Sequence, residues 1–243
     1  MKILYLFHDL MNLYGDNGNI RYLSWILQEK NLVPEVIVDM KSVGDELSFD
    51  GYDLIYCGAG TESRRMIALE YLRPYKEQLK KAILEKGTPA LFTGNSWTIL
   101  GRSIREPSGT TEGLGLFDYD TDETNEQRIV QDSLFTSFID GKQIVGFVNK
   151  KGEIKNVTSP LFRVETGSAN VLGGPTEGFY SGNFFATYLT GPLLVKNPPF
   201  LRMLLTRVLG TDAVSAIPDI LDPETEKAYE TTLRKIKSGN LPY

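Results

Sequence analysis

The sequence has very few of the residues that carry nucleophilic and metal chemistry. Its 243 residues include a single cysteine, Cys57, and a single histidine, His8. One cysteine excludes an intramolecular disulfide and a cysteine-based metal cluster, and it is compatible with a reducing compartment. We therefore expect no metal site, and a mechanism that uses a thiol or an imidazole has few candidate residues.

The sequence also lacks an excess of basic residues and long apolar runs. A formal net charge of −5 and an isoelectric point near 5.1 give no electrostatic footprint for nucleic acid. The apolar start at residues 3–7 is too short for the core of a signal peptide, and no other apolar run approaches the thickness of a bilayer. We expect a cytoplasmic protein that neither binds nucleic acid nor spans a membrane.

The first half of the chain alternates short apolar runs with longer periodic stretches, a pattern typical of β-α-β units around a parallel sheet. The runs predicted to form strands are residues 3–7, 36–38, 53–57 and 89–93. Asp16 or Asn17 is a candidate cap for the first helix, because short polar side chains favour that position. The fold class is therefore predicted to be α/β.

Residues 105–190 are richer in Gly, Thr, Ser and Asn, and their short strand-like runs at 144–148, 161–164 and 184–189 predict antiparallel or edge strands. Two prolines at 198 and 199 open a further helix that Gly210 ends. Another helix is predicted to begin at Asp222. The segment after residue 212 is either a docking appendage or a frayed tail.

Three loops follow predicted strands at the edge where open parallel sheets bind their ligands. They are residues 9–19 (DLMNLYGDNGN), 58–63 (GAGTES) and 93–97 (TGNSW). Together with EGLG at 112–115 and ATYLTGP at 186–192, they resemble the glutaminase subunit, GatD type, of lipid II isoglutaminyl synthase. That subunit belongs to the CobB/CobQ-like branch of class I glutamine amidotransferases, and the matches run in unbroken order over residues 1–210.

The resemblance implies a three-layer α/β sandwich of the class I glutamine amidotransferase type, a flavodoxin-like parallel sheet with an antiparallel extension. It implies a glutamine amidotransferase-like domain at residues 1–212, and it leaves 213–243 as a C-terminal helical appendage or tail. No cofactor is implied. The implied partner is a Mur-ligase-like subunit of the MurT type that receives ammonia for amidation of peptidoglycan precursors, in a heterodimer.

The family mechanism needs a cysteine thiolate on a strand-to-helix elbow, a histidine that activates it, and backbone amides that hold the oxyanion. Carried over by position, the cysteine falls on Gly94 and the histidine on Thr190. Glycine has no side chain to attack a carboxamide, and a threonine hydroxyl does not accept a proton near neutral pH. The resemblance therefore implies a pseudoenzyme that acts as a partner or binding subunit.

Replacement nucleophiles are the alternative. Ser96 lies two residues after the elbow, but the sequence lacks a Gly-x-Ser-x-Gly pattern, so a helix-capping hydroxyl is the favoured interpretation. Cys57 and His8 end neighbouring predicted strands and are a conceivable pair. A cysteine inside an apolar strand is more often a small buried hydrophobic residue. An active amidohydrolase that uses Ser96 or Cys57 remains the competing hypothesis.

Three residues are candidates for binding glutamine or a related amide. Arg128 aligns with the family's carboxylate-binding arginine if one residue is inserted within 121–127, and an exposed loop arginine is the alternative interpretation. Gly58 and Gly60 match an oxyanion-type loop by position. They equally suit the tight turn that any strand-to-helix crossover needs.

Overall fold

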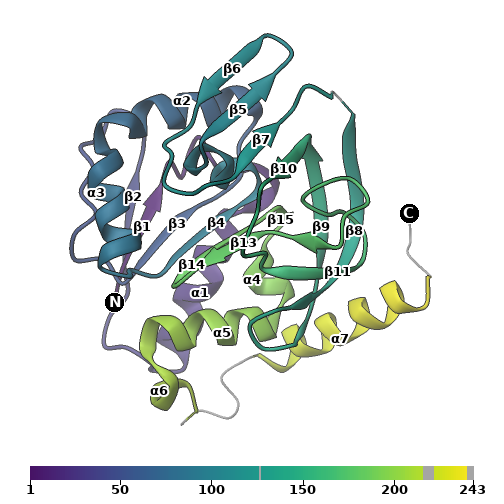
Figure 1. Ribbon diagram of the computed structural model, residues 1–243. Helices are drawn as coiled ribbons and strands as arrows, with labels where there is room; N and C mark the ends of the chain where they lie inside the picture. Colours follow the sequence, from purple (N-terminus) through teal and green to yellow (C-terminus); the bar gives the residue numbers. More distant parts are fainter. Residues whose placement is uncertain (126, 216–221, 240–243) are drawn as a thin grey trace.

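A computed structural model of the chain describes residues 1–125, 127–215 and 222–239, and its centre is a six-stranded sheet (Figure 1). The strand order is β13-β14-β4-β3-β1-β2. These strands are β1 (Lys2–Leu6), β2 (Ile37–Lys41), β3 (Leu54–Cys57), β4 (Ala90–Thr93), β13 (Phe179–Ser181) and β14 (Phe184–Thr187). All pairings are parallel except that of the edge strand β13. The predicted parallel sheet is confirmed.

Helices cover both faces of this sheet. Helices α2 and α3 lie on one side, and α1, α4 and α5 lie on the other (Figure 1). Every residue of β3 and β4 is buried, which explains why these strands read as continuous apolar runs and not as alternating ones. The helices are α1 (Asn17–Glu29), α2 (Glu62–Leu72), α3 (Lys76–Lys80), α4 (Leu193–Lys196), α5 (Pro198–Leu209), α6 (Thr211–Ser215) and α7 (Pro223–Lys237).

Short helical turns connect these elements. They are η1 (Leu13–Gly15), η2 (Arg73–Tyr75), η3 (Lys81–Glu85) and η4 (Gly94–Leu100). Pro74 lies in η2, where α2 ends, because proline cannot donate the backbone hydrogen bond that continues a helix. Helix α5 ends at Gly210, which adopts a φ of +89°, so the predicted helix stop is confirmed.

Two smaller sheets form the extension, and their pairings are antiparallel except that of β5 with β7. One has the order β12-β11-β8-β9-β15, the other β10-β7-β5-β6. Their strands are β5 (Ser103–Glu106), β6 (Gly109–Glu112), β7 (Asp120–Asp122), β8 (Arg128–Ser137), β9 (Gln143–Lys151), β10 (Glu153–Lys155), β11 (Phe162–Thr166), β12 (Thr176–Glu177) and β15 (Leu189–Thr190). Strands β9 and β11 pair only antiparallel within the described residues, as predicted for 144–148 and 161–164.

The prediction for residues 184–189 was only partly right, because β14 pairs antiparallel with β13 on one side but parallel with β4 on the other. Strand β14 lies inside the main sheet, where Phe184 pairs parallel with Ala90 of β4. All four of its residues are buried, and an apolar run of this kind gives no sign of the direction of its partner. Strand β15 follows directly and pairs with β9, so the chain passes from the main sheet into the extension at residue 188. This passage places Thr190 near the carboxyl end of β4.

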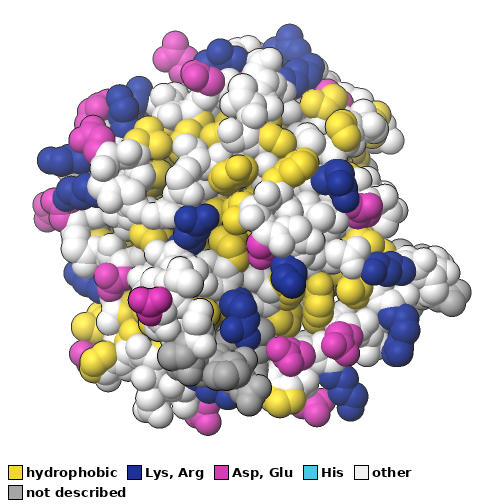
Figure 2. All heavy atoms as spheres, turned by 60° about the horizontal axis from the view of Figure 1, so that its bottom comes forward, with side chains coloured by type: hydrophobic (Ala, Val, Ile, Leu, Met, Phe, Trp, Pro, Cys, Tyr) yellow, Lys and Arg dark blue, Asp and Glu magenta, His cyan; other side chains and the backbone are white. Residues whose placement is uncertain are grey.

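The outer surface mixes charges of both signs. On the face shown in Figure 2, basic and acidic side chains are interspersed, with exposed apolar side chains among them. Among the described residues, no helix is long and apolar enough to cross a membrane. No group of three or more His, Cys, Asp or Glu side chains in the described ranges is arranged to hold a metal ion.

Helix α7 docks on the extension. Ile236 packs with Leu134 and Val145 in a small cluster apart from the main core. The Tyr229 hydroxyl donates a hydrogen bond to the Gln143 carbonyl at 2.7 Å. The described part of the C-terminal segment is therefore a packed helix, while a domain boundary at residue 212 stays a prediction.

Replacing Ile236 with alanine should lower the free energy of unfolding by about 1–3 kcal/mol, because the substitution removes buried methyl groups from this cluster. Urea denaturation measures the change. Lys235→Ala, on the exposed side of the same helix, is the control and should have little effect. Equal effects of the two substitutions would mean that α7 does not dock as described.

Candidate functional site

A cavity of about 160 Å³ lies at the carboxyl ends of β3 and β4. Its lining includes residues from all three loops singled out in the sequence, at 9–19, 58–63 and 93–97. Arg128 and Thr190, which come from the extension, also line it. The structure therefore brings four of the predicted site residues together: Gly60, Gly94, Arg128 and Thr190.

Gly94 and Thr190 are neighbours. Gly94 follows β4 directly and has a φ of +61°, a backbone conformation that L-residues rarely adopt. A Cβ at position 94 would lie 3.5 Å from the Thr190 Cγ2 atom. The Thr190 hydroxyl donates to the Phe147 carbonyl at 3.2 Å. Neither of these two neighbouring residues carries a thiol or an imidazole.

The loop at residues 58–60 directs its polar backbone groups into the protein. The Ala59 amide donates to the Asp16 Oδ2 atom at 2.5 Å, and the Gly60 amide donates to the Asn95 Oδ1 atom at 3.0 Å. The Asn95 Nδ2 atom in turn donates to the Gly60 carbonyl at 2.9 Å. An oxyanion hole needs amides that point at the ligand, and these two amides already have partners.

Gly58 and Gly60 are required by packing. A Cβ at position 58 would lie 2.5 Å from the Met11 carbonyl oxygen, and one at position 60 would lie under 3.0 Å from the Met11 sulfur. The first loop therefore packs directly against the second. A side chain at position 58 would overlap backbone, whereas one at position 60 would need the Met11 side chain to move. This observation supports the tight-turn interpretation of both glycines.

Asp16 links the first two loops. It stands at the N-terminus of α1, but its side chain makes no capping hydrogen bond, and the Asn17 amide donates to Asn12 Oδ1 instead at 2.8 Å. Asp16 is therefore the N-cap residue, as predicted, but the expected side-chain cap is absent, because its carboxylate accepts hydrogen bonds from the Ala59 amide and the Thr93 hydroxyl. The carboxylate is fully buried, and burial raises its pKa to about 6.

Cys57 and His8 do not form a pair. Cys57 is fully buried in β3, where burial raises the pKa of its thiol well above the usual range. The His8 Nε2 atom lies 3.3 Å from the Ser42 hydroxyl, on the side of β2. Neither residue is among those that line the cavity in the described part of the chain.

Ser96 has a structural role. Its buried hydroxyl hydrogen-bonds to the carbonyls of Thr93, at 2.7 Å, and Cys57, at 3.1 Å. A capping hydroxyl would accept a bond from an amide, so the capping interpretation was wrong in this respect. The hydroxyl instead satisfies carbonyl groups where β3 and β4 end.

Arg128 lines the cavity and is partly exposed. Its guanidinium forms an ion pair with Glu62, at the start of α2, and donates to the Asn149 Oδ1 atom at 3.0 Å. A ligand carboxylate would compete with Glu62 for the same guanidinium. The position is compatible with the predicted binding role, which stays a prediction.

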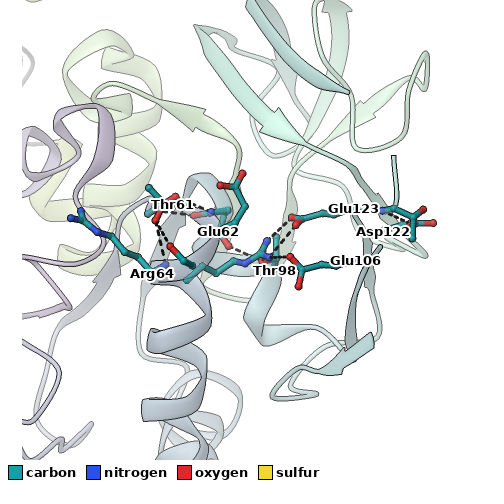
Figure 3. A network of polar contacts seen from close by, with 12 residues as sticks. Thr61, Glu62, Arg64, Thr98, Glu106, Asp122 and Glu123 are labelled. Carbon is teal, nitrogen blue, oxygen red and sulfur yellow. Dashed lines mark hydrogen bonds and ion pairs between the residues drawn. The ribbon is translucent and has the colours of Figure 1, made fainter. Parts of the chain in front are cut away.

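A buried ion pair below the cavity was missed by sequence reasoning. Arg65 of α2 is fully buried, and its guanidinium makes two hydrogen bonds, at 2.5 and 3.1 Å, to the carboxylate of Glu123, which lines the cavity. Glu106 and Thr98 converge on the same place (Figure 3). The available signal was a charged residue on the apolar face of α2, in register with Ala68, Leu69 and Leu72.

Comparison with known proteins identifies the family. Residues 2–198 match the CobB/CobQ-like glutamine amidotransferase domain. The chain belongs to this family. It is 32% identical over 227 residues to the GatD subunit of lipid II isoglutaminyl synthase (glutamine-hydrolyzing) from Staphylococcus aureus strain N315, covering 93% of this chain and 91% of that subunit. It is 30% identical to GatD from Streptococcus pneumoniae strain ATCC BAA-255 / R6, covering 97% and 92%.

The fold of the family is also found in solved structures. A glutamine amidotransferase from Thermotoga maritima superimposes with a TM-score of 0.52 and 15% identity, covering 98% of this chain and 92% of that one. The expected class I amidotransferase-like fold is thus confirmed. Within this amidotransferase domain, the assignment of the nucleophile to position 94 and of the base to position 190 stays a prediction.

Asp16 should make the stability of the domain depend on pH. Its pKa is about 6 in the folded protein, above the ordinary value of 3.8, so the folded state takes up a proton before the unfolded chain does. Stability should therefore rise as pH falls from about 7 toward about 4, by on the order of 3 kcal/mol for this group. Asp16→Asn should lack this contribution.

Urea denaturation of both proteins across this pH range measures the difference in unfolding free energy. Glu177, whose pKa burial raises to about 7, contributes equally to both proteins and cancels. A difference that does not change with pH would show that Asp16 keeps its ordinary pKa.

Proposed function

We propose that the chain is a GatD-like subunit that does not hydrolyse glutamine and that serves a Mur-ligase-like subunit, in a heterodimer, as a binding or scaffold partner in amidation of peptidoglycan precursors. The observation that carries the proposal is the elbow after β4. Gly94 occupies it without a side chain, and Thr190 is the residue beside it.

The chemistry at this elbow supports inactivity. Glutaminase catalysis on this fold needs a nucleophile that attacks the carboxamide carbon and a base that takes its proton. Gly94 supplies no attacking atom. The Thr190 hydroxyl already donates its proton to Phe147 and is no base near neutral pH.

The replacement nucleophiles are poorly placed. The Cys57 thiol is buried in the sheet and held in its protonated form by a raised pKa, whereas thiol nucleophiles react as thiolates. The Ser96 hydroxyl is directed at backbone carbonyls. Neither side chain lies at the cavity, which weighs against an active amidohydrolase that uses either residue.

Retained features support a binding role. The cavity is still present, and Arg128 remains at its rim as a candidate partner for the carboxylate of glutamine or a related amide. The GatD relatives are subunits of a glutamine-hydrolyzing synthase, so a partner subunit is part of the proposal. The exposed first loop, with Tyr14 40% exposed beside the cavity, is the proposed docking surface.

The purified chain should release no ammonia from glutamine above background, alone or with a Mur-ligase-like partner, because Gly94 and Thr190 supply neither a thiolate nor an imidazole at the cavity. Cys57→Ala and Ser96→Ala should leave this result unchanged. Staphylococcus aureus GatD with its partner subunit serves as the positive control. Ammonia release that one of the two substitutions abolishes would overturn the proposal and name the nucleophile.

Tyr14→Ala should weaken binding of the ligase-like partner by roughly ten-fold or more, because exposed aromatic residues at interface centres contribute strongly to affinity. Trp25→Ala is the matched control, since Trp25 is 44% exposed on α1 outside the loop and should have no effect. Titration calorimetry with the partner measures both. Equal affinities of Tyr14→Ala and the unmodified chain would exclude the first loop as the docking surface.

A further inference from the structure

The loop at residues 58–60, called the Ala59 loop below, is fixed on two sides. The first loop of the domain holds Ala59 through the Asp16 carboxylate, which accepts from the Ala59 amide, and through the Leu13 amide, which donates to the Ala59 carbonyl at 2.8 Å. From the other side, the Asn95 side chain makes two hydrogen bonds with Gly60. The amide and the carbonyl of Ala59 and those of Gly60 are thus all hydrogen-bonded.

The Ala59 loop places the Ala59 methyl group directly beside Gly94. A Cβ built on Gly94 would lie under 3.0 Å from the Ala59 Cβ and 3.1 Å from the Ala59 Cα, and real Cβ atoms essentially never approach another atom within 3.0 Å. The obstructing atoms are backbone and Cβ atoms, so they do not swing aside as the end of a long side chain does. The Thr190 Cγ2 atom, at 3.5 Å, would be in ordinary contact. Of these two neighbours, only Ala59 excludes a side chain at position 94.

We propose that Ala59 keeps position 94 free of a side chain. Its methyl group, in a loop held by Asp16 and Asn95, fills the space that a nucleophilic side chain at position 94 needs. The inference rests on the proposed function in taking position 94 as the nucleophile position. It follows that Gly94→Cys with Thr190→His does not rebuild a glutaminase site unless Ala59 also becomes glycine.

The test is a double-substitution cycle measured by thermal unfolding, which does not depend on any activity. Gly94→Ala should lower the Tm by roughly 5–10 °C, from steric overlap and from an alanine forced to positive φ. Ala59→Gly alone should change the Tm by at most about 3 °C. The double variant should regain roughly half of the loss caused by Gly94→Ala, because the overlap is gone while the backbone strain remains.

Gly182→Ala is the matched control for backbone strain. Gly182 has a φ of +58°, close to that of Gly94, but a Cβ there would meet no atom within 4 Å. Gly182→Ala should lower the Tm less than Gly94→Ala does. Adding Ala59→Gly should not restore the Tm that Gly182→Ala loses. Asn95→Ala removes the two hydrogen bonds that hold Gly60. In an Asn95→Ala background, Gly94→Ala should therefore lower the Tm by less than it does in the unmodified chain.

The outcomes separate this inference from the proposed function. Equal losses for Gly94→Ala and Gly182→Ala, or no rescue by Ala59→Gly, would overturn the role of Ala59 while leaving inactivity toward glutamine untouched. Glutamine hydrolysis by the unmodified chain would overturn the proposed function without changing the unfolding cycle. If Gly94→Ala fails to fold, folding of the double variant supports the inference, and failure of both variants contradicts it.

Discussion

The hydrogen bond from the Ala59 amide to the buried Asp16 carboxylate is the contact on which the shape of the cavity depends. It joins the loop after β1 to the loop after β3, and these loops form much of the cavity wall. Burying a carboxylate without a cationic partner is unfavourable, as the raised pKa of Asp16 shows. The amides of Ala59 and Gly191 and the hydroxyl of Thr93 offset part of that penalty.

The conformation of Gly94 and the position of Ala59 together explain how the elbow forms without a side chain at position 94. An elbow that carries a side chain at positive φ stores strain, which the surrounding structure must hold in place. Glycine adopts φ of +61° with little strain, so Gly94 removes this cost, and the adjacent space is then filled by Ala59. Any side chain introduced at position 94 therefore meets both a conformational and a steric barrier.

The sequence predicted those features that depend on local patterns and missed those that depend on partners distant in the chain. Buried strands and the Gly210 helix end follow from apolar runs and from backbone preference. The parallel pairing of β14 with β4 joins segments about ninety residues apart, and no periodicity encodes it. Likewise, Asp16 preceding a helix indicates a cap, and only its burial against Ala59 shows another role. The proximity of Gly94 and Thr190 was expected from the family resemblance and not from the residues themselves.

The contacts that fix the cavity are separate from the residues that chemistry would need. The Arg65 to Glu123 ion pair below the cavity and the bonds of Asp16 and Asn95 to the Ala59 loop involve neither Gly94 nor Thr190. Thr190 contributes one hydrogen bond, to Phe147. Because buried polar networks of this kind are costly to disrupt, the cavity is held by contacts that do not depend on the side chains at positions 94 and 190. The proposed binding role therefore needs no reacting group at these two positions.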